Sequence, residues 1–219
     1  MRNRTLCLDA HGTAFDANAA KRTILTEETG CIIPDAEFAA GGIYRLGKKY
    51  PNPDKKTLEQ INLGTYRRSM GKLFEFDNYV RLMQPYAGVR EELVALAQVF
   101  DHICIVANAR GATVDAIQAV VDKYELPINE VIATYGDDHE KRDYFQMADV
   151  VIDNETRYLS AMSGSGVVPI LMRTPEGATG WAYDRLQKTP RGPYMVANDF
   201  GHAGLLARNA ITGPVDLVA

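Results

Sequence analysis

Short apolar runs alternate along this chain with longer amphipathic stretches. The apolar runs, rich in valine and isoleucine, cover residues 5–8, 103–107, 131–134, 150–152 and 167–172. In the stretches 89–99 and 113–124, apolar side chains recur every three or four residues, which is typical of helices. Short buried strands that alternate with helices indicate a parallel sheet with helical crossovers. The pattern therefore predicts an α/β fold, a Rossmann-like parallel sheet with helices on both faces.

One long polar segment interrupts this alternation. Residues 17–86 lack a convincing buried strand and read as helices separated by Gly41-Gly42 and by Pro51-Asn52-Pro53. We interpret them as a small helical cap inserted after the first strand, with residues 1–16 and 87–219 forming the core domain. Such an insertion lies over the carboxyl edge of the sheet, where its basic residues, Arg45 among them, could face an anionic substrate. For any single one of these charges, a solvated surface is the simpler explanation.

Composition and charge narrow the classes of partner. The chain has 219 residues, 46% hydrophobic, with a formal net charge of -4. This balance argues against a dedicated binder of nucleic acid polymers or of anionic membranes, since both usually carry a basic face. Its three cysteines, Cys7, Cys31 and Cys104, show no CxxC spacing and are expected to be reduced thiols. The N-terminus leaves no room for a signal peptide before the first strand, so we expect a cytoplasmic protein.

The first apolar run ends on a carboxylate. Asp9 directly follows Leu8 and precedes a turn through His11, Gly12 and Thr13. A strand that ends on an aspartate presents it at the carboxyl edge of the sheet, where open α/β folds hold their ligands. Gly12 allows a tight turn there. Taken alone, these residues are explained more simply as an ordinary turn between a strand and a loop.

Four segments in order give the turn a more specific interpretation. Asp9-Ala10-His11-Gly12-Thr13 resembles motif I of the haloacid dehalogenase superfamily, which is Asp-x-Asp-Gly-Thr in its phosphatases. The strand that ends on Ala107 and Asn108 resembles motif II, Lys141 stands where the motif III lysine would be, and residues 148–155 resemble the acidic motif IV. The cap and the run from Lys141 to Asp153 are most similar to the 5′(3′)-deoxyribonucleotidase branch.

The resemblance implies hydrolysis of a small phosphate monoester, such as a (deoxy)nucleoside monophosphate. Asp9 would attack the phosphoryl group and form an aspartyl phosphate, while Lys141 offsets the repulsion between nucleophile and substrate. Mg²⁺ would be held by Asp9, by the main-chain carbonyl of His11 and by Asp153. The His11 imidazole would serve as the acid and base. Binding of the phosphorylated substrate is assigned to four residues: Ala107, Asn108, Arg110 and Arg45.

Three departures from the motifs keep other functions open. His11 replaces the second motif I aspartate, Ala107 replaces the motif II hydroxyl, and Asn154 replaces a second motif IV acid. A catalytically impaired relative that binds a nucleotide, a metabolite or a protein partner is one alternative. A 2-haloacid dehalogenase is another, because its motif I is similar to Asp-Ala-Tyr-Gly-Thr and halide departure needs no acid. The sequence fixes neither the substrate nor the oligomeric state, and a homodimer remains open.

Overall fold

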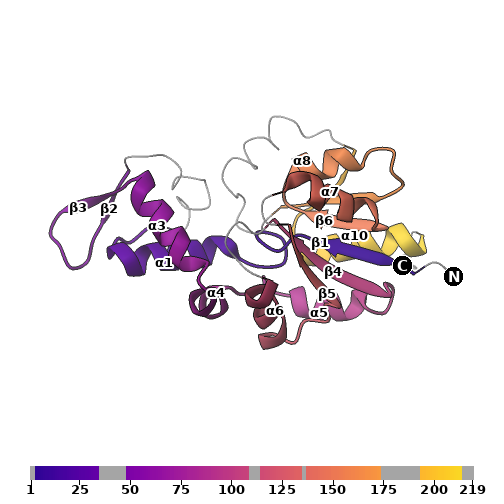
Figure 1. Ribbon diagram of the computed structural model, residues 1–219, viewed down its shortest axis with the longest axis horizontal. Coiled ribbons are helices and arrows are strands. Elements are labelled where there is room, and N and C mark those ends of the chain that lie inside the picture. Colours follow the sequence, from indigo (N-terminus) through magenta and orange to yellow (C-terminus); the bar gives the residue numbers. More distant parts are fainter. Residues whose placement is uncertain (1–2, 35–47, 109–113, 135–136, 174–192, 214–219) are drawn as a thin grey trace, which may run out of the picture.

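The computed structural model describes residues 3–34, 48–108, 114–134, 137–173 and 193–213. Its main sheet has six strands in the order β5-β4-β1-β6-β7-β8, and every neighbouring pair is parallel (Figure 1). Within this sheet the chain order is 3-2-1-4-5-6, which is a doubly wound arrangement. The strands are β1 (Thr5–Leu8), β4 (His102–Ala107), β5 (Glu130–Ala133), β6 (Val150–Asp153), β7 (Val168–Met172) and β8 (Met195–Ala197).

Helices cover both faces of this sheet, as the alternation predicts. Leu6 and Leu8 face the larger apolar core, to which α5 (Val89–Leu96), α6 (Val114–Lys123) and α10 (Phe200–Thr212) contribute. Cys7 points to the opposite face, under α7 (Asp138–Gln146) and α8 (Thr156–Leu159). Strand residues alternate between faces, so the even and odd positions of β1 pack into different layers. A 3-10 turn, η2 (Ser160–Met162), follows α8.

The register of β1 sets the position of the carboxyl edge. Leu8 pairs with Ile105 of β4 on one side and with Ile152 of β6 on the other. The Asp9 amide then donates to the Ile152 carbonyl at 2.9 Å, so the last ladder bond is made by the aspartate itself. The chain reverses its winding direction at β1, and ligands of open α/β sheets bind beside such a strand.

The segment that we interpret as a helical cap also contains strands. Between α1 (Ala17–Thr29) and the helices α3 (Leu63–Leu73) and α4 (Phe76–Leu82), an antiparallel pair is formed by β2 (Lys48–Pro51) and β3 (Leu58–Ile61). The expectation of helices alone was wrong here. Each strand has four residues, and β3 has only Ile61 buried, which leaves too little alternation to detect. The separator Pro51-Asn52-Pro53 lies at the end of β2, and Gly41-Gly42 lies outside the described residues.

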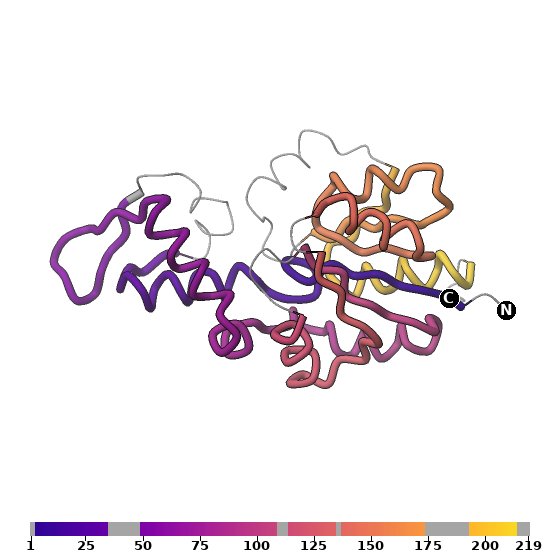
Figure 2. The backbone as a smooth tube through the Cα atoms, in the orientation of Figure 1, coloured from indigo at the N-terminus to yellow at the C-terminus, as the bar shows by residue number. Residues whose placement is uncertain are grey.

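This segment has an apolar cluster of its own. Tyr50 and Ile61 pack there with three residues of α1 and its continuation: Leu25, Cys31 and Ile33. Figure 2 shows α1 leading away from the main sheet and the chain returning through α3 and α4. The Asp16 amide donates to the Gln84 carbonyl and the Tyr86 amide to the Ala14 carbonyl, so the outgoing and returning chains are tied together beside motif I.

The helix caps and the cysteines complete the description of the fold. Asp199 caps α10, because its side chain accepts a hydrogen bond from the His202 amide at 2.7 Å. His139 lies in the first turn of α7, where Asp137 is the N-cap. The cysteines Cys7, Cys31 and Cys104 are buried free thiols. None of the described helices combines the length and the apolarity needed to cross a membrane.

Candidate active site

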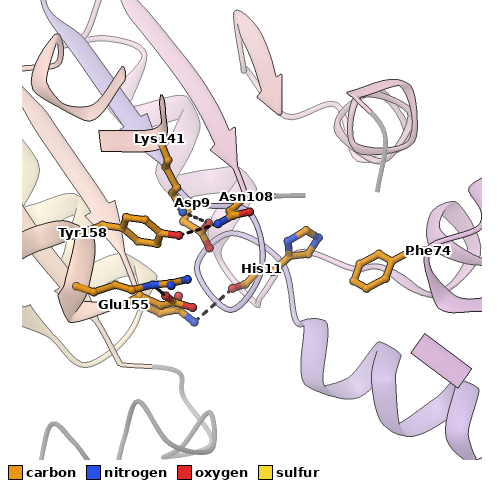
Figure 3. Close-up of a pocket in the computed structure, with 9 residues that line it drawn as sticks. Asp9, His11, Phe74, Asn108, Lys141, Glu155 and Tyr158 are labelled. Carbon is orange, nitrogen blue, oxygen red and sulfur yellow. Dashed lines mark hydrogen bonds and ion pairs between the residues drawn. The ribbon is translucent and has the colours of Figure 1, made fainter. Parts of the chain in front are cut away.

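A cavity of about 360 Å³ lies at the carboxyl edge of the main sheet (Figure 3). Asp9, beyond the end of β1, and Asn108, beyond the end of β4, both line it. Helix α7 contributes Lys141, and the turn after β6 contributes Asn154 and Glu155. The remaining lining residues are His11, Phe74, Arg157 and Tyr158. Residues from five separate stretches of the chain therefore meet at the edge that the sequence singled out.

Lys141 connects two acidic groups at the base of this cavity. Its ammonium nitrogen lies 2.5 Å from Asp9 Oδ1 and 2.9 Å from Asp153 Oδ2, and the lysine is 1% exposed. Burial alone would lower the pKa of Lys141, but the charges of Asp153 and Asp9 outweigh it and raise that pKa above its usual range. Lys141 is therefore a fixed positive charge that touches the candidate nucleophile.

Asp153 is fully buried at the end of β6. Burial raises its pKa above the usual range even though Lys141 attracts the ionised form, and the nearby charge of Asp9 adds to the effect. Its Oδ1 accepts a hydrogen bond from the Glu155 amide at 2.6 Å. Its Oδ2, apart from the ion pair with Lys141, has no hydrogen-bond donor among the described groups. Two buried carboxyl groups thus share one ammonium.

The donor atoms at the base of the cavity show whether a divalent cation fits there. Asp9, Asp153 and the His11 carbonyl are hard oxygen donors, the kind that Mg²⁺ prefers, and Mg²⁺ in proteins usually keeps several waters. Asn154 Nδ2 donates to the His11 carbonyl at 3.3 Å and so holds that oxygen at the site. The described residues contain no group of three His, Cys, Asp or Glu side chains that could bind a metal. The donor set fits a partly hydrated Mg²⁺, in which two carboxylates and one carbonyl suffice.

The side chain of His11 is directed towards the helical segment. Its Nε2 lies 2.8 Å from the Tyr79 hydroxyl, and its ring meets the rings of Phe74 and Tyr79 edge-on. In Figure 3 the ring lies on the Phe74 side of the cavity, while Lys141 and Tyr158 lie on the other. Burial lowers the pKa of His11 to about 4, so the imidazole is neutral at pH 7. Nε2, one of its two ring nitrogens, is thus taken by Tyr79.

Tyr158 links several of the lining residues and was missed by the sequence analysis. Its hydroxyl donates to Asp138 Oδ1 at 2.7 Å and accepts from Asn108 Nδ2 at 2.8 Å. The Lys141 ammonium lies 4.4 Å from the centre of the same ring. Burial raises the pKa of Tyr158, which keeps the hydroxyl protonated and able to donate. The only sequence signal was an aromatic residue within one helical turn of the motif IV loop, which is too common to be diagnostic.

Of the four residues assigned to substrate binding, the structure describes two, and these two differ in their position relative to the cavity. Asn108 lines the cavity, with Nδ2 also donating to Asp138 Oδ1 at 2.8 Å. Ala107 does not line it: the residue is fully buried in β4, and its carbonyl accepts from the Thr134 amide at 3.0 Å. Arg45 and Arg110 lie outside the described residues. The structure therefore brings Asp9, His11, Asn108, Lys141 and Asp153 together and separates Ala107 from them.

Comparisons with known proteins identify the fold. No protein-family model and no curated protein matches the sequence. A haloacid dehalogenase-like hydrolase from Streptococcus pneumoniae superposes with a TM-score of 0.57 at 13% identity, covering 94% of this chain and 97% of that one. A predicted phosphoglycolate phosphatase from Haemophilus somnus gives 0.55 at 10% identity, covering 94% and 99%. A defluorinating L-2-haloacid dehalogenase gives 0.56 at 10%, covering 94% and 96%. At such identities the likeness concerns architecture alone, and this chain has the α/β fold of the haloacid dehalogenase-like hydrolases.

Proposed function

We propose that this chain hydrolyses a small phosphate monoester, with Asp9 as the nucleophile. The contact between Asp9 Oδ1 and the Lys141 ammonium at 2.5 Å carries the proposal, because it places a carboxylate beside a buried cation inside a cavity. The other oxygen, Oδ2, accepts no hydrogen bond from the described part of the chain. Two of the similar solved structures are named as phosphoglycolate phosphatases, which agrees with this reaction class.

In the first step, Asp9 forms a bond to phosphorus as the bond to the ester oxygen breaks. The leaving oxygen keeps the electron pair and takes up a proton from solvent water, and a second water molecule then hydrolyses the aspartyl phosphate to release phosphate and restore Asp9. Lys141 reduces the repulsion between two anions throughout. Bound Mg²⁺ would stabilise negative charge on the phosphoryl oxygens. Asp9, Asp153 and the His11 carbonyl would hold that cation.

Release of inorganic phosphate tests the proposal. The panel should contain small phosphate esters and nucleoside and deoxynucleoside monophosphates, each with and without Mg²⁺. We expect turnover that needs Mg²⁺ and disappears in Asp9→Asn, which keeps the size of the side chain and removes its charge. Asp143→Asn, at an exposed position of α7, is the matched control and should remain active. Turnover that survives Asp9→Asn would refute the role of Asp9.

One observation favours a second candidate. His11 Nε2 is engaged by the Tyr79 hydroxyl and the imidazole is neutral at pH 7, and the N–H of a neutral imidazole is too weak an acid to protonate a leaving alkoxide. Halide needs no such proton, and one similar solved structure is a defluorinating L-2-haloacid dehalogenase. A dehalogenase would release halide from a 2-haloacid even when EDTA removes divalent cations, and Asp9→Asn would abolish this release. A folded protein without either activity would instead support a binding role for the cavity.

A further inference from the structure

Arg157 is a second cation, besides Lys141, among the described residues that line the cavity. The proposed hydrolysis gives it no role. It lies in α8, directly after the motif IV loop, and lines the same cavity as Asp9. Its side chain is 39% exposed, whereas that of Lys141 is 2% exposed. The cavity thus combines a deep positive charge beside the candidate nucleophile with a shallower one nearer to solvent.

Three neighbours hold the Arg157 guanidinium in place. Nη1 donates to Asp138 Oδ2 at 2.8 Å, and Nε donates to Glu155 Oε2. The guanidinium carbon also lies 4.6 Å from the centre of the Tyr158 ring, in a cation–π contact. Tyr158 is itself fixed by its bond to Asp138, so three linked side chains orient the arginine. An arginine fixed in this way loses little conformational entropy when it binds a ligand.

The same contacts leave part of the guanidinium available. Each acid takes one N–H, and Nη2 makes no hydrogen bond within the described residues. Lys141, by contrast, is already occupied by Asp9 and Asp153. Arginine presents its N–H groups as a planar fork that fits a carboxylate or a phosphate. Arg157 can therefore accept a second anionic group while Lys141 and Asp9 deal with the first.

We infer that Arg157 binds a second anionic group of the substrate, so that the site favours phosphate monoesters that also bear a carboxylate or another phosphate. The inference rests on the proposed function. Figure 3 shows Tyr158 and Glu155, two of the residues that hold Arg157, across the cavity from His11 and Phe74. The anion-binding wall is thus formed by the core, and the aromatic wall by His11 together with Phe74 of the helical segment.

Matched substrate pairs test this inference. 2-Phosphoglycolate and ethyl phosphate differ by one carboxylate, and propane-1,3-diol bisphosphate and propyl phosphate differ by one phosphate. For the wild type we expect kcat/KM to be at least about 10-fold higher for the member that has two anionic groups, in at least one pair. One charged hydrogen bond would give a difference of this size. The pair that shows the preference identifies the group. In Arg157→Met the ratio should fall to about 1, and in Arg157→Lys it should be intermediate.

The ratio separates specificity from general damage. A variant that is merely less active or less stable lowers both members of a pair alike and leaves the ratio unchanged, which would overturn the inference. The control is Arg90→Met. Arg90 is an exposed arginine of α5 that pairs with Glu125, and its variant should keep the wild-type ratio. Ratios near 1 for both wild-type pairs would also overturn it.

Calorimetric titration with the same four compounds distinguishes failure of the Arg157 inference from failure of the proposed hydrolysis. If no ester is hydrolysed, the anion site is still supported when the compound with two anionic groups binds more tightly than its partner and this preference disappears in Arg157→Met. Equal binding of both members, or no binding of any, refutes it. In either case the phosphate-release assay on Asp9→Asn reports separately on catalysis.

Discussion

Lys141 Nζ lies 2.5 Å from Asp9 Oδ1, although the two residues are 132 positions apart in the chain. The contact depends on β1 placing Asp9 at the sheet edge and on α7 presenting Lys141 above it, with Asp137 capping the first turn of that helix. Because Asp153 touches the same ammonium, loss of the lysine would leave two buried carboxylates without a cation partner. The catalytic proposal and the stability of the fold therefore depend on the same side chain.

Lys141→Met is expected to lower the free energy of unfolding by about 3–5 kcal/mol, the usual cost of breaking a buried ion pair from one side. Urea denaturation at pH 7 in EDTA measures it. Lys72→Met, which removes a half-exposed lysine paired with Glu28, is the control and should cost less than about 1 kcal/mol. The double variant Lys141→Met/Asp153→Asn should be more stable than the sum of its single changes predicts. Strict additivity would show that the ion pair is energetically irrelevant.

Tyr158 is expected to act through its neighbours. Tyr158→Phe keeps the ring beside Lys141 but removes the hydroxyl that holds Asn108 and Asp138. We expect a loss of about 1–3 kcal/mol in stability, because the buried amide of Asn108 loses one acceptor. Tyr158→Leu also removes the ring and should cost more, because the smaller side chain leaves part of a buried site unfilled.

The kinetic effect of these two variants separates positioning from packing. If Tyr158 orients Lys141 through its ring, kcat falls further in Tyr158→Leu than in Tyr158→Phe, while KM changes mainly through Asn108 in both. Steady-state kinetics on the best substrate of the panel gives both constants. A kcat that stays at the wild-type value in Tyr158→Leu would mean that the ring does not position the lysine.

The stability of the protein should decrease on acidification because of His11. Burial lowers the pKa of this imidazole from 6.5 to about 4, so between these values the unfolded chain binds a proton that the folded chain does not. The free energy of unfolding therefore falls as the pH falls through this window, by about 1–3 kcal/mol in total for a partly exposed ring. His11→Gln cannot take up the proton and should lose less stability than the wild type between pH 7.5 and pH 4.5. Urea titrations in EDTA at both pH values measure the difference, and parallel losses would contradict the assignment.

The sequence predicted the main sheet well because the buried strands of a parallel sheet read as continuous apolar runs. Asp9, Asn108 and Asp153 were identifiable because each follows or ends such a run. The β2–β3 pair was not predicted, since only a small cluster around Tyr50 and Ile61 buries it. The partners of His11 were also beyond prediction, because Tyr79 reaches it from 68 positions away through the packing of α4. Strand ends could be read locally, whereas side-chain partnerships required the fold.

Divalent cations should stabilise the folded protein even where no turnover is measured. Asp9 and Asp153 share one ammonium, so a cation that binds them relieves repulsion in the folded state and has no comparable site in the unfolded chain. At a Mg²⁺ concentration about ten times the dissociation constant, the gain is about 1.4 kcal/mol, which raises Tm by about 2–4 °C per kcal/mol for a chain of this size. Thermal unfolding in EDTA and in increasing Mg²⁺ measures the shift. Asp153→Asn should abolish most of it, whereas Asp143→Asn should not, because that residue is exposed on α7. An equal rise in Tm in all three proteins would indicate a nonspecific salt effect and would remove Asp153 from the proposed cation site.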